Sequence, residues 1–292
     1  MSGSRHRIVD EHVYDGMVLP GLVEAKSVDL LKTTALHDSD VIVATYPKAG
    51  TTVMQEIVYL IHTDGDFKTA DEVSIIFRFP YMEMTNPLDN SSLADVLNVD
   101  PPRLLKSHLP AGVFGETLNK SKTKFVIVMR NPKDVLVSDY FFYKGHTILG
   151  NFEGSWDEFF KLFEDDCLVY GNYFDHVLSW WEVRHNPNVL IVMFEDIVGK
   201  PVEVIRQVAA HLDKTISDEL VRKIAHRIEF DNMKKIPSAS YSDAPFYRHD
   251  IVQFMRKGKV GDWRNYFSEE QNKIVDDMYE KKCVEKRLVF QF

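Results

Sequence analysis

The chain has 292 residues, 45% of them hydrophobic, so it can bury a substantial core, and no repeat or low-complexity tract divides it. Its 44 acidic and 35 basic residues give a formal net charge of −9, which argues against binding to bulk nucleic acid. We therefore expect one domain over residues 1–292 and no nucleic-acid partner.

The composition also limits the metal and membrane chemistry that we expect. Only Cys167 and Cys283 are present, and the 11 histidines show no His-Glu-x-x-His spacing, so we predict no metal site. The sequence shows no secretory leader and no apolar stretch of about 18 residues. We expect a soluble protein of a reducing compartment, the cytoplasm, that does not bind to membranes.

The first predicted unit is a strand, a loop and a helix within residues 41–61. The strand is apolar throughout, and apolar residues at three- and four-residue spacing from Val53 onwards predict the helix. The loop between them, TYPKAGTT at 45–52, places unpaired N–H groups, the charge of Lys48 and the flexible Gly50 at the start of the helix. This pattern predicts a phosphate site. The simpler alternative is an ordinary turn in which Pro, Gly and Thr serve only geometry and capping.

Two further predicted strands end in cationic side chains. The strand that ends at 103–105 leads into the sequence KSH at 106–108, and the strand 125–129 leads into Arg130 and a helix that holds Ser138. Arg130 offers a planar donor fork that suits a phosphate, and Ser138, about two turns into the helix, can add a hydroxyl.

A last predicted strand, 189–194, is followed by Glu195 and Asp196. Strands thus alternate with helices along the chain, which predicts an α/β fold with a parallel sheet. The segment 232–252 looks irregular and suits a mobile gate loop over the active site. A basic glycine loop, RKGKVG at 256–261, adds a fourth cationic cluster. We interpret these clusters, in an acidic protein, as the site of a small polyanion rather than as solvated surface.

Three segments together resemble the signature sequences of the cytosolic sulfotransferases. They are TYPKAGTT at 45–52, RNPKD at 130–134 followed by Ser138, and RKG at 256–258 followed by GDW. Their order and spacing are similar to those of the family over nearly the whole chain. The resemblance implies a central parallel sheet flanked by helices, in a three-layer sandwich like that of the P-loop kinases.

The resemblance also implies a reaction, in which 3′-phosphoadenosine 5′-phosphosulfate (PAPS) gives its sulfuryl group to a hydroxyl or amine of a small apolar acceptor. The product of the donor is adenosine 3′,5′-bisphosphate (PAP), and no metal takes part. Lys48, Gly50, Thr51 and Thr52 would hold the 5′-phosphosulfate end. The 3′-phosphate would be held by Arg130, Ser138, Arg256, Lys257 and Gly258. The full set of donor-binding residues expected in this way is Lys48, Ala49, Gly50, Thr51, Thr52, Val53, Arg130, Ser138, Phe194, Ile228, Phe230, Met255, Arg256, Lys257 and Gly258.

Four residues would be catalytic by the same resemblance. His108 would be the general base that removes the acceptor's proton, because imidazole titrates near neutrality. Lys48 and Lys106 would stabilise the charge that develops during in-line transfer, and Ser138 would restrain Lys48 before the acceptor binds. The alternative for His108 is a capping or packing residue.

The chain departs from the family pattern where the family contacts adenine. Val53, Phe194 and Ile228 stand in place of a tryptophan, a tyrosine and a threonine, so a stacking face and two hydroxyls are missing, whereas Phe230 remains. We therefore expect weaker or less adenine-selective binding of the donor.

An acceptor pocket is expected where the chain aligns with the substrate-lining regions of the family. Its aromatic walls suit planar phenols, and His146 favours a polar or acidic group on the acceptor, although each aromatic residue is equally compatible with an ordinary core. The expected pocket residues are Phe79, Tyr81, Met84, Lys106, His108, Phe142, His146, Ile148, Tyr241, Phe246 and Tyr247. The family's C-terminal dimer segment matches poorly around Glu269 and Lys273, so a monomer and a weak homodimer both remain open.

Two classes of function remain open at this point. An active sulfotransferase is favoured because Lys48, Lys106, His108 and Ser138 are all present. The alternative is a nucleotide-binding sulfotransferase-like protein with weak or lost activity, for which the changes at the adenine site argue. A kinase on the related fold is disfavoured, because Lys48 precedes Gly50 and the Gly-Lys-Ser/Thr sequence that binds a magnesium nucleotide is missing.

Overall fold

A parallel four-stranded sheet forms the centre of the computed structural model, which describes residues 11–149, 152–242 and 244–292. In spatial order its strands are β4 (Leu104–Ser107), β3 (Val41–Thr45), β5 (Lys124–Met129) and β6 (Val189–Met193). The register pairs Val43 of β3 with Lys106 on one side and with Val126 on the other. The predicted α/β class with a parallel sheet is confirmed.

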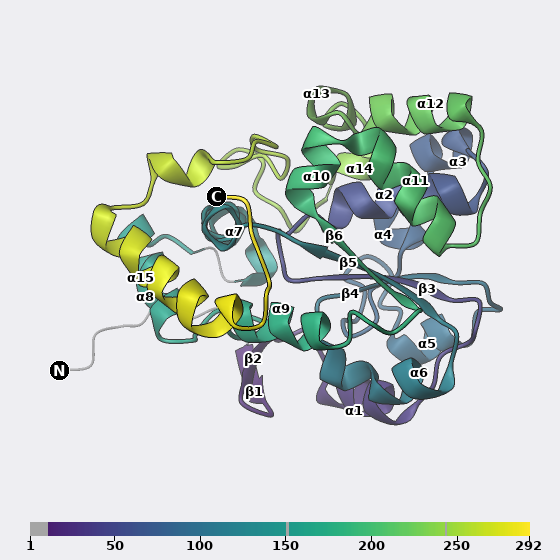
Figure 1. Cartoon of the computed structure of the whole chain (residues 1–292). Coiled ribbons are helices and arrows are strands. Elements are labelled where there is room, and N and C mark those ends of the chain that lie inside the picture. The colour runs from purple at the N-terminus through teal and green to yellow at the C-terminus, as the bar shows by residue number, and fades with distance from the viewer. Residues whose placement is uncertain (1–10, 150–151, 243) are drawn as a thin grey trace.

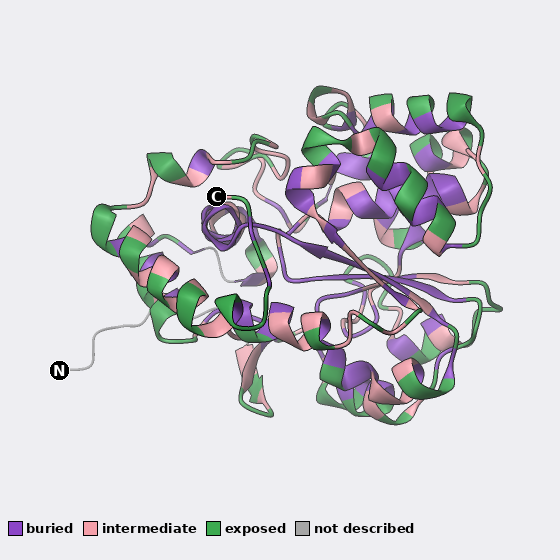
Figure 2. Ribbon diagram, in the orientation of Figure 1, coloured by how far each residue is buried: buried purple, intermediate pink, exposed green. Residues whose placement is uncertain are grey.

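Side chains of the central strands alternate between two cores, because successive residues of a strand point to opposite faces. On β5, Phe125 and Ile127 face one core, whereas Val126 and Val128 face the other. All five residues of β3 are buried, and Figure 2 shows the strands enclosed between helices. A sheet that is apolar on both faces requires helices on both sides, which gives three layers.

One layer of helices lies above the sheet in Figure 1. It is held to the sheet by the apolar face of the helix that follows β3, which buries Met54, Ile57 and Val58 against Val126 and Val128. The helices of this layer are α2 (Thr51–His62), α3 (Phe67–Glu72), α4 (Ile75–Arg78), α10 (Phe194–Gly199), α11 (Pro201–His211), α12 (Asp218–Ile228), α13 (Phe230–Met233) and α14 (Pro237–Ser240).

A second layer lies on the opposite face of the sheet (Figure 1). Its packing centres on Trp180, which is fully buried with its ring centre 5.4 Å from that of Phe125 on β5 and 5.9 Å from that of Phe114. The elements of this layer are α1 (Ala25–Thr33), α5 (Leu93–Leu97), the 3-10 turn η1 (Ala111–Phe114), α6 (Gly115–Lys120) and α9 (Tyr173–Glu182).

The buried helix α7 (Pro132–Gly145) follows β5, at the left of the sheet in Figure 1. It begins cleanly because the Asn131 side chain accepts from the Lys133 N–H and Pro132 occupies the first helical position. Around it lie α8 (Trp156–Glu164), α15 (Glu269–Tyr279), the 3-10 turns η2 (Thr147–Leu149) and η3 (Asp262–Asn265), and the π-helical segment η4 (Glu280–Val284). An antiparallel hairpin of β1 (Glu11–Tyr14) and β2 (Met17–Pro20) completes the described elements.

The element boundaries differ from the sequence prediction in three places. Lys106 and Ser107 belong to β4, because the pairing of β4 with β3 continues through both residues. Phe194 begins α10 instead of ending the preceding strand. The segment 232–252 was expected to be irregular, but it contains the short helix α14; residue 243 lies outside the described part of the chain.

Candidate functional site

The predicted site residues come together at the carboxyl edge of the sheet, where the order of the strands changes direction at β3. A cavity of about 480 Å³ lies there, and all the predicted donor and acceptor residues line it except Ala49. The methyl group of Ala49 is fully buried, and its N–H donates to the Tyr46 carbonyl oxygen at 3.2 Å. The cationic clusters of four separate segments therefore share one cavity.

The loop between β3 and α2 has the backbone of an anion cradle. Lys48 has a positive φ of 63°, and Gly50, the N-cap of α2, has φ 121°. A β-carbon at Gly50 would lie 2.7 Å from Cδ2 of Phe194, so a larger residue would collide there. Because glycine has no side chain to cap the helix, the first N–H groups of α2 are left for a ligand.

The Lys48 ammonium lies between two aromatic rings. Its Nζ is 4.5 Å from the ring centre of Phe142 and 3.9 Å from that of Phe254. Burial lowers the pKa of Lys48 to about 7, the negative charge of Asp139 opposes this, and neighbouring cations add to it. An anion in the cavity would raise the pKa again, so Lys48 and a bound phosphate stabilise one another.

His108 follows β4 directly and is oriented by the backbone of β3. Its Nδ1 lies 2.7 Å from the Thr45 carbonyl oxygen, which can only accept, so Nδ1 carries the hydrogen and Nε2 is left as a base. The His108 N–H donates to Glu83 Oε1 at 2.6 Å. Burial and the nearby Lys106 charge hold the pKa of His108 well below its ordinary value. The imidazole is therefore neutral near pH 7 and able to take a proton.

Two tyrosines hold the His108 ring edge-on. The ring centres of Tyr81 and Tyr170 lie 5.3 and 5.4 Å from that of His108, and their hydroxyls are 3.1 Å apart. The Lys106 Nζ lies 4.3 Å from the Tyr81 ring centre. Sequence reasoning missed Tyr170, which no motif marks, and Phe254, which adjoins the predicted Met255 and could have been found by that adjacency.

A second cationic group centres on Arg130, at the end of β5. Its Nη1 donates to the Lys48 carbonyl oxygen and its Nη2 to that of Lys259, both at 3.3 Å, so one guanidinium joins the two basic loops. Its Cζ lies 4.2 Å from the Phe194 ring centre. Its Nε is buried and has no partner in the described part of the chain. An unsatisfied buried donor on a cation favours a bound anion.

The basic loop near the C-terminus lies beside Arg130. Arg256 and Lys257 both donate to the Asp262 carboxylate, at 2.6 and 2.7 Å. Gly258 has φ 60°, and a β-carbon there would lie 2.1 Å from Cδ2 of Phe230. The Phe230 ring is thus packed directly on the Gly258 backbone, where any side chain would displace it.

The two remaining ends of the cavity differ in chemistry. The lining residues that α2, α10, α12 and α13 contribute are mostly apolar and include Val53, Phe194, Ile197, Val198, Ile228 and Phe230. At the other end, the ring of His146 lies 4.7 Å from that of Phe142 and 5.4 Å from that of Phe246, centre to centre. Burial lowers the pKa of His146 to about 3, so this imidazole is neutral and offers hydrogen bonds instead of the charge that an acidic acceptor would need.

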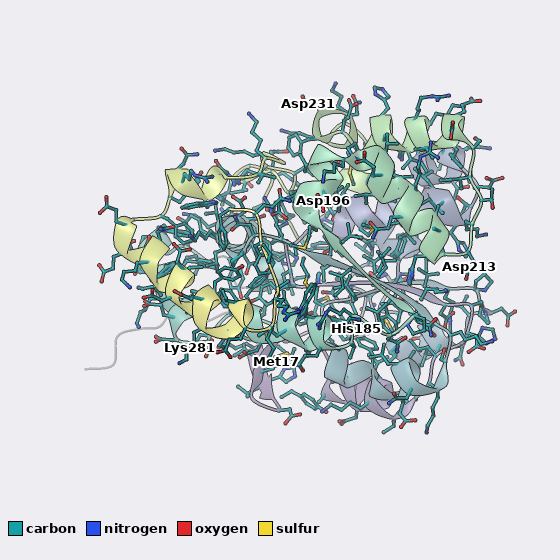
Figure 3. The ribbon with its side chains drawn as sticks, viewed as in Figure 1. Met17, His185, Asp196, Asp213, Asp231 and Lys281 are labelled. Atoms are coloured by element: carbon teal, nitrogen blue, oxygen red, sulfur yellow. The ribbon has the colours of Figure 1, made fainter. Side chains whose placement is uncertain are left out.

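Some of the acidic side chains lie on the outside of the molecule. Asp213 and Asp231 are exposed and lie at the edge of the molecule in Figure 3. In the described ranges 11–149, 152–242 and 244–292, no group of three or more His, Cys, Asp or Glu side chains could hold a metal ion. None of the helices in those ranges is long and apolar enough to cross a membrane.

The family described as "Sulfotransferase domain" matches residues 38–287. The chain belongs to the sulfotransferase family. This sulfotransferase is 34% identical to bovine sulfotransferase 1A1 over 270 residues, which cover 92% of this chain and 91% of the relative. It is 36% identical to rat sulfotransferase 1A1 over 275 residues, which cover 90% and 94%.

Solved structures of the family have the same fold. Mouse sulfotransferase SULT7A1, complexed with PAP, superposes with a TM-score of 0.73 at 27% identity, covering 93% of this sulfotransferase and 94% of that chain. Retinol dehydratase in complex with androsterone and PAP superposes with a TM-score of 0.81 at 26% identity, covering 91% and 86%. The P-loop-kinase-like three-layer sandwich is confirmed, and the chain is an enzyme of sulfuryl transfer; the non-catalytic alternative is not favoured.

Proposed function

We propose that this sulfotransferase transfers the sulfuryl group of PAPS to a hydroxyl or amine of a small apolar acceptor. The observation that carries the proposal is one cavity with two cationic groups, at Lys48 and at Arg130, and a neutral buried imidazole beside them. Bound PAPS supplies the activated sulfuryl group and leaves as PAP. PAP is present in the structures of mouse SULT7A1 and of retinol dehydratase, which supports this donor.

Each end of the donor has its own cationic cradle. Lys48 and the first N–H groups of α2, at Thr51 and Thr52, hold the 5′ end. The unpaired Nε of Arg130 is a donor for the 3′-phosphate. Arg256 and Lys257 share a single carboxylate, so this loop keeps a net positive charge for the same phosphate. The remaining contacts to the 3′-phosphate come from Ser138 and the Gly258 backbone.

His108 acts as the general base for the acceptor. Its Nε2 takes the proton of the acceptor hydroxyl or amine as the acceptor atom bonds to sulfur, because Nδ1 is already bonded to Thr45. Lys106 and Lys48 lie in the same cavity and stabilise the negative charge that develops on the sulfuryl and bridging oxygens. The aromatic end of the cavity suits a phenol or an apolar alcohol with a hydrogen-bonding group near the neutral His146.

The segment 232–252 acts as a gate over this cavity. Met233, Tyr241, Phe246 and Tyr247 all lie in this segment and line the cavity. A chain segment that forms one wall can admit the acceptor by moving. We further propose that the protein is a monomer or a weak homodimer and lies in the cytoplasm, as expected for the cytosolic sulfotransferases that the sequence resembles. Light scattering after size exclusion and fractionation of a tagged protein test these two assignments.

Substitution of His108 tests the proposed chemistry. In His108→Ala we expect kcat with PAPS and a panel of phenols, alcohols and amines to fall roughly 10²- to 10⁴-fold, while the affinity for PAP is retained. The matched control is His185→Ala, at an exposed histidine (labelled in Figure 3) that does not line the cavity, and this variant should keep full activity. Equal activity of the two variants toward an acceptor would exclude His108 as the base.

A thermal shift with PAP, ADP and AMP tests the donor cradles without an acceptor. A ligand at a hundredfold its dissociation constant contributes about 2.7 kcal/mol, which raises the melting temperature by several degrees. We expect PAP to stabilise the protein more than ADP or AMP, because only PAP reaches both cationic groups. Equal shifts with ADP would contradict the assignment of Arg130 to the 3′-phosphate.

A further inference from the structure

Asp139 follows Ser138 in α7 and carries a carboxyl group that the proposed reaction does not use. Its side chain is 0% exposed, and neither carboxyl oxygen has a hydrogen-bond partner in the described part of the chain. Removing a carboxylate from water without hydrogen bonds costs several kcal/mol, so such groups are rare in folded proteins. A group of this kind beside a ligand cavity calls for a physical role.

The position of Asp139 on α7 brings it close to Lys48. Phe142 lies three residues further along the helix and so shares a face with Asp139. The Lys48 Nζ is 4.5 Å from the Phe142 ring centre, one helical turn from the carboxyl group. Lys48 is therefore a cation near Asp139, and the charges of the two groups act on one another.

Two tyrosines near Asp139 do not satisfy its carboxyl group. Burial raises the pKa of both Tyr46 and Tyr143, and the nearby charge of Asp139 raises both further. The Tyr46 hydroxyl donates to the Gly171 carbonyl oxygen at 3.0 Å, and the Tyr143 hydroxyl accepts from the Val169 N–H at 2.9 Å. Neither hydroxyl makes a hydrogen bond to the carboxylate, and the interaction left to it is with the charge of Lys48.

The charges around Lys48 show why it needs a counter-charge. Burial lowers the pKa of Lys48 to about 7, and Asp139 is the charge that opposes this shift. Burial raises the pKa of Asp139 to about 7, and the charge of Lys48 opposes this increase. Three neighbouring cations lower the pKa of Lys48 further, and the nearby histidines are neutral. The charged and titratable groups that face the pair are Lys106 of β4, Arg130 after β5, Arg256 of the basic loop, His108, His146, Tyr46 and Tyr143.

We propose that Asp139 is a positioning residue for the donor site, whose carboxylate keeps Lys48 cationic in a cavity crowded with other cations until the donor arrives. The proposal rests on the proposed role of Lys48 at the 5′ end of the donor. Because the carboxylate makes no hydrogen bond, no such bond has to break when the ammonium turns toward a phosphate. Asp139 thus supplies a negative charge and leaves the hydrogen bonds of the Lys48 ammonium free for the donor.

The test measures the charge of Lys48 directly in the donor-free full-length protein. Only an uncharged amine reacts with an acetylating reagent, so the extent of Lys48 acetylation against pH, read by peptide mass spectrometry, gives the midpoint of its titration. In Asp139→Asn we expect this midpoint to fall by about 1 pH unit or more, because a neighbouring opposite charge is lost. Exposed Lys281 (Figure 3) serves as the internal standard for the reagent.

The matched control is Glu83→Gln, which neutralises another fully buried carboxyl group. Glu83 favours the charged form of Lys106 and is not among the groups that shift Lys48. This variant should lower the midpoint of Lys106 and should not lower that of Lys48, because a less charged Lys106 depresses the Lys48 pKa less. Asp139→Ser provides a second, smaller neutral replacement and should lower the Lys48 midpoint as Asp139→Asn does.

An unchanged or raised Lys48 midpoint in the Asp139 variant that folds would overturn the proposal. A loss of melting temperature with no shift of the midpoint would also overturn it, since that is the signature of a packing role. The donor site is tested separately by saturating PAP, which should protect Lys48 of the unmodified chain from acetylation. Failure of that protection would contradict the assigned donor site and leave the coupling of Asp139 to Lys48 intact.

Discussion

At the scale of single residues, burial decides which groups of the site carry charge. Burial lowers the pKa of Lys48 to about 7 and that of Lys106 to about 8, and it holds His108 in the neutral form. A neutral imidazole with a free Nε2 is a base, and a partly discharged lysine gains more from a bound anion than a lysine in water does. The same residues would be ordinary solvated groups if the cavity were open to bulk water.

The apolar wall where the adenine of the donor is expected to bind leads to a prediction at Val53. This residue is partly buried at the start of α2 and lines the cavity. Val53→Trp adds a stacking face, and because base–aromatic stacking is worth about 1 to 3 kcal/mol, we expect roughly 5- to 150-fold tighter PAP binding by calorimetry. Val289→Trp, at a residue that is 70% exposed, is the matched control. If Val53→Trp left the affinity unchanged, the cavity would already hold the base by other contacts.

At the scale of elements, the basic loop is attached to the first turn of α7. The Asp134 carboxylate accepts from the Gly261 N–H at 2.7 Å and from the Trp263 N–H at 3.0 Å. These two charge-assisted bonds fix the direction in which Arg256 and Lys257 leave the loop. The second cationic cradle therefore depends on a helix that also carries Ser138.

Removal of this attachment should weaken the donor site from a distance. Hydrogen bonds to a charged group contribute about 1.5 to 3 kcal/mol each, so we expect Asp134→Ala to weaken PAP binding roughly 10-fold or more and to speed amide exchange in residues 256–263. Asp134→Asn keeps one acceptor oxygen and should lose less affinity. Unchanged exchange in the loop of Asp134→Ala would contradict its attachment to α7.

The sequence predicted the elements that follow simple periodicity and missed contacts made at long range. Val53 and its helical repeats predicted α2, and the apolar run before Arg130 predicted β5, because each pattern depends only on near neighbours in the chain. The end of β4 was placed too early, since pairing with β3 decides where a strand stops. Tyr170 and Asp139 owe their importance to side chains from other segments, and no local pattern marks such contacts.

At the scale of the whole molecule, several buried histidines are neutral in the fold. Burial lowers the pKa of His176 to about 4, from an ordinary value of 6.5, and its Nε2 donates to the His108 carbonyl oxygen at 2.9 Å. In the unfolded chain this histidine takes up a proton below pH 6.5, whereas the folded protein takes it up only near pH 4. The stability contributed by the neutral form is thus fully present above pH 6.5 and is lost as the pH falls toward 4.

The carboxyl groups of Glu83 and Asp139 act in the opposite direction over the same range. Their pKa values are raised to about 7, so the folded protein binds their protons before the unfolded chain does, and the stability that they contribute grows as the pH falls. The pH dependence of the free energy of unfolding therefore combines the effect of the buried histidines with the opposite effect of these carboxyl groups. A comparison of the unmodified chain with a single histidine variant isolates one group.

His176→Gln removes the titrating group and keeps an N–H that can reach the His108 carbonyl oxygen. The unmodified chain, but not this variant, should lose about 2 kcal/mol in free energy of unfolding between about pH 7.5 and about pH 5 through His176, since 1.5 pH units below 6.5 correspond to that energy. Urea unfolding of both proteins at several pH values measures the difference. His185→Gln, at an exposed histidine, is the control for the substitution itself. Curves for His176→Gln that run parallel to those of the unmodified chain would show that His176 is protonated in the fold, against the burial that the structure gives it.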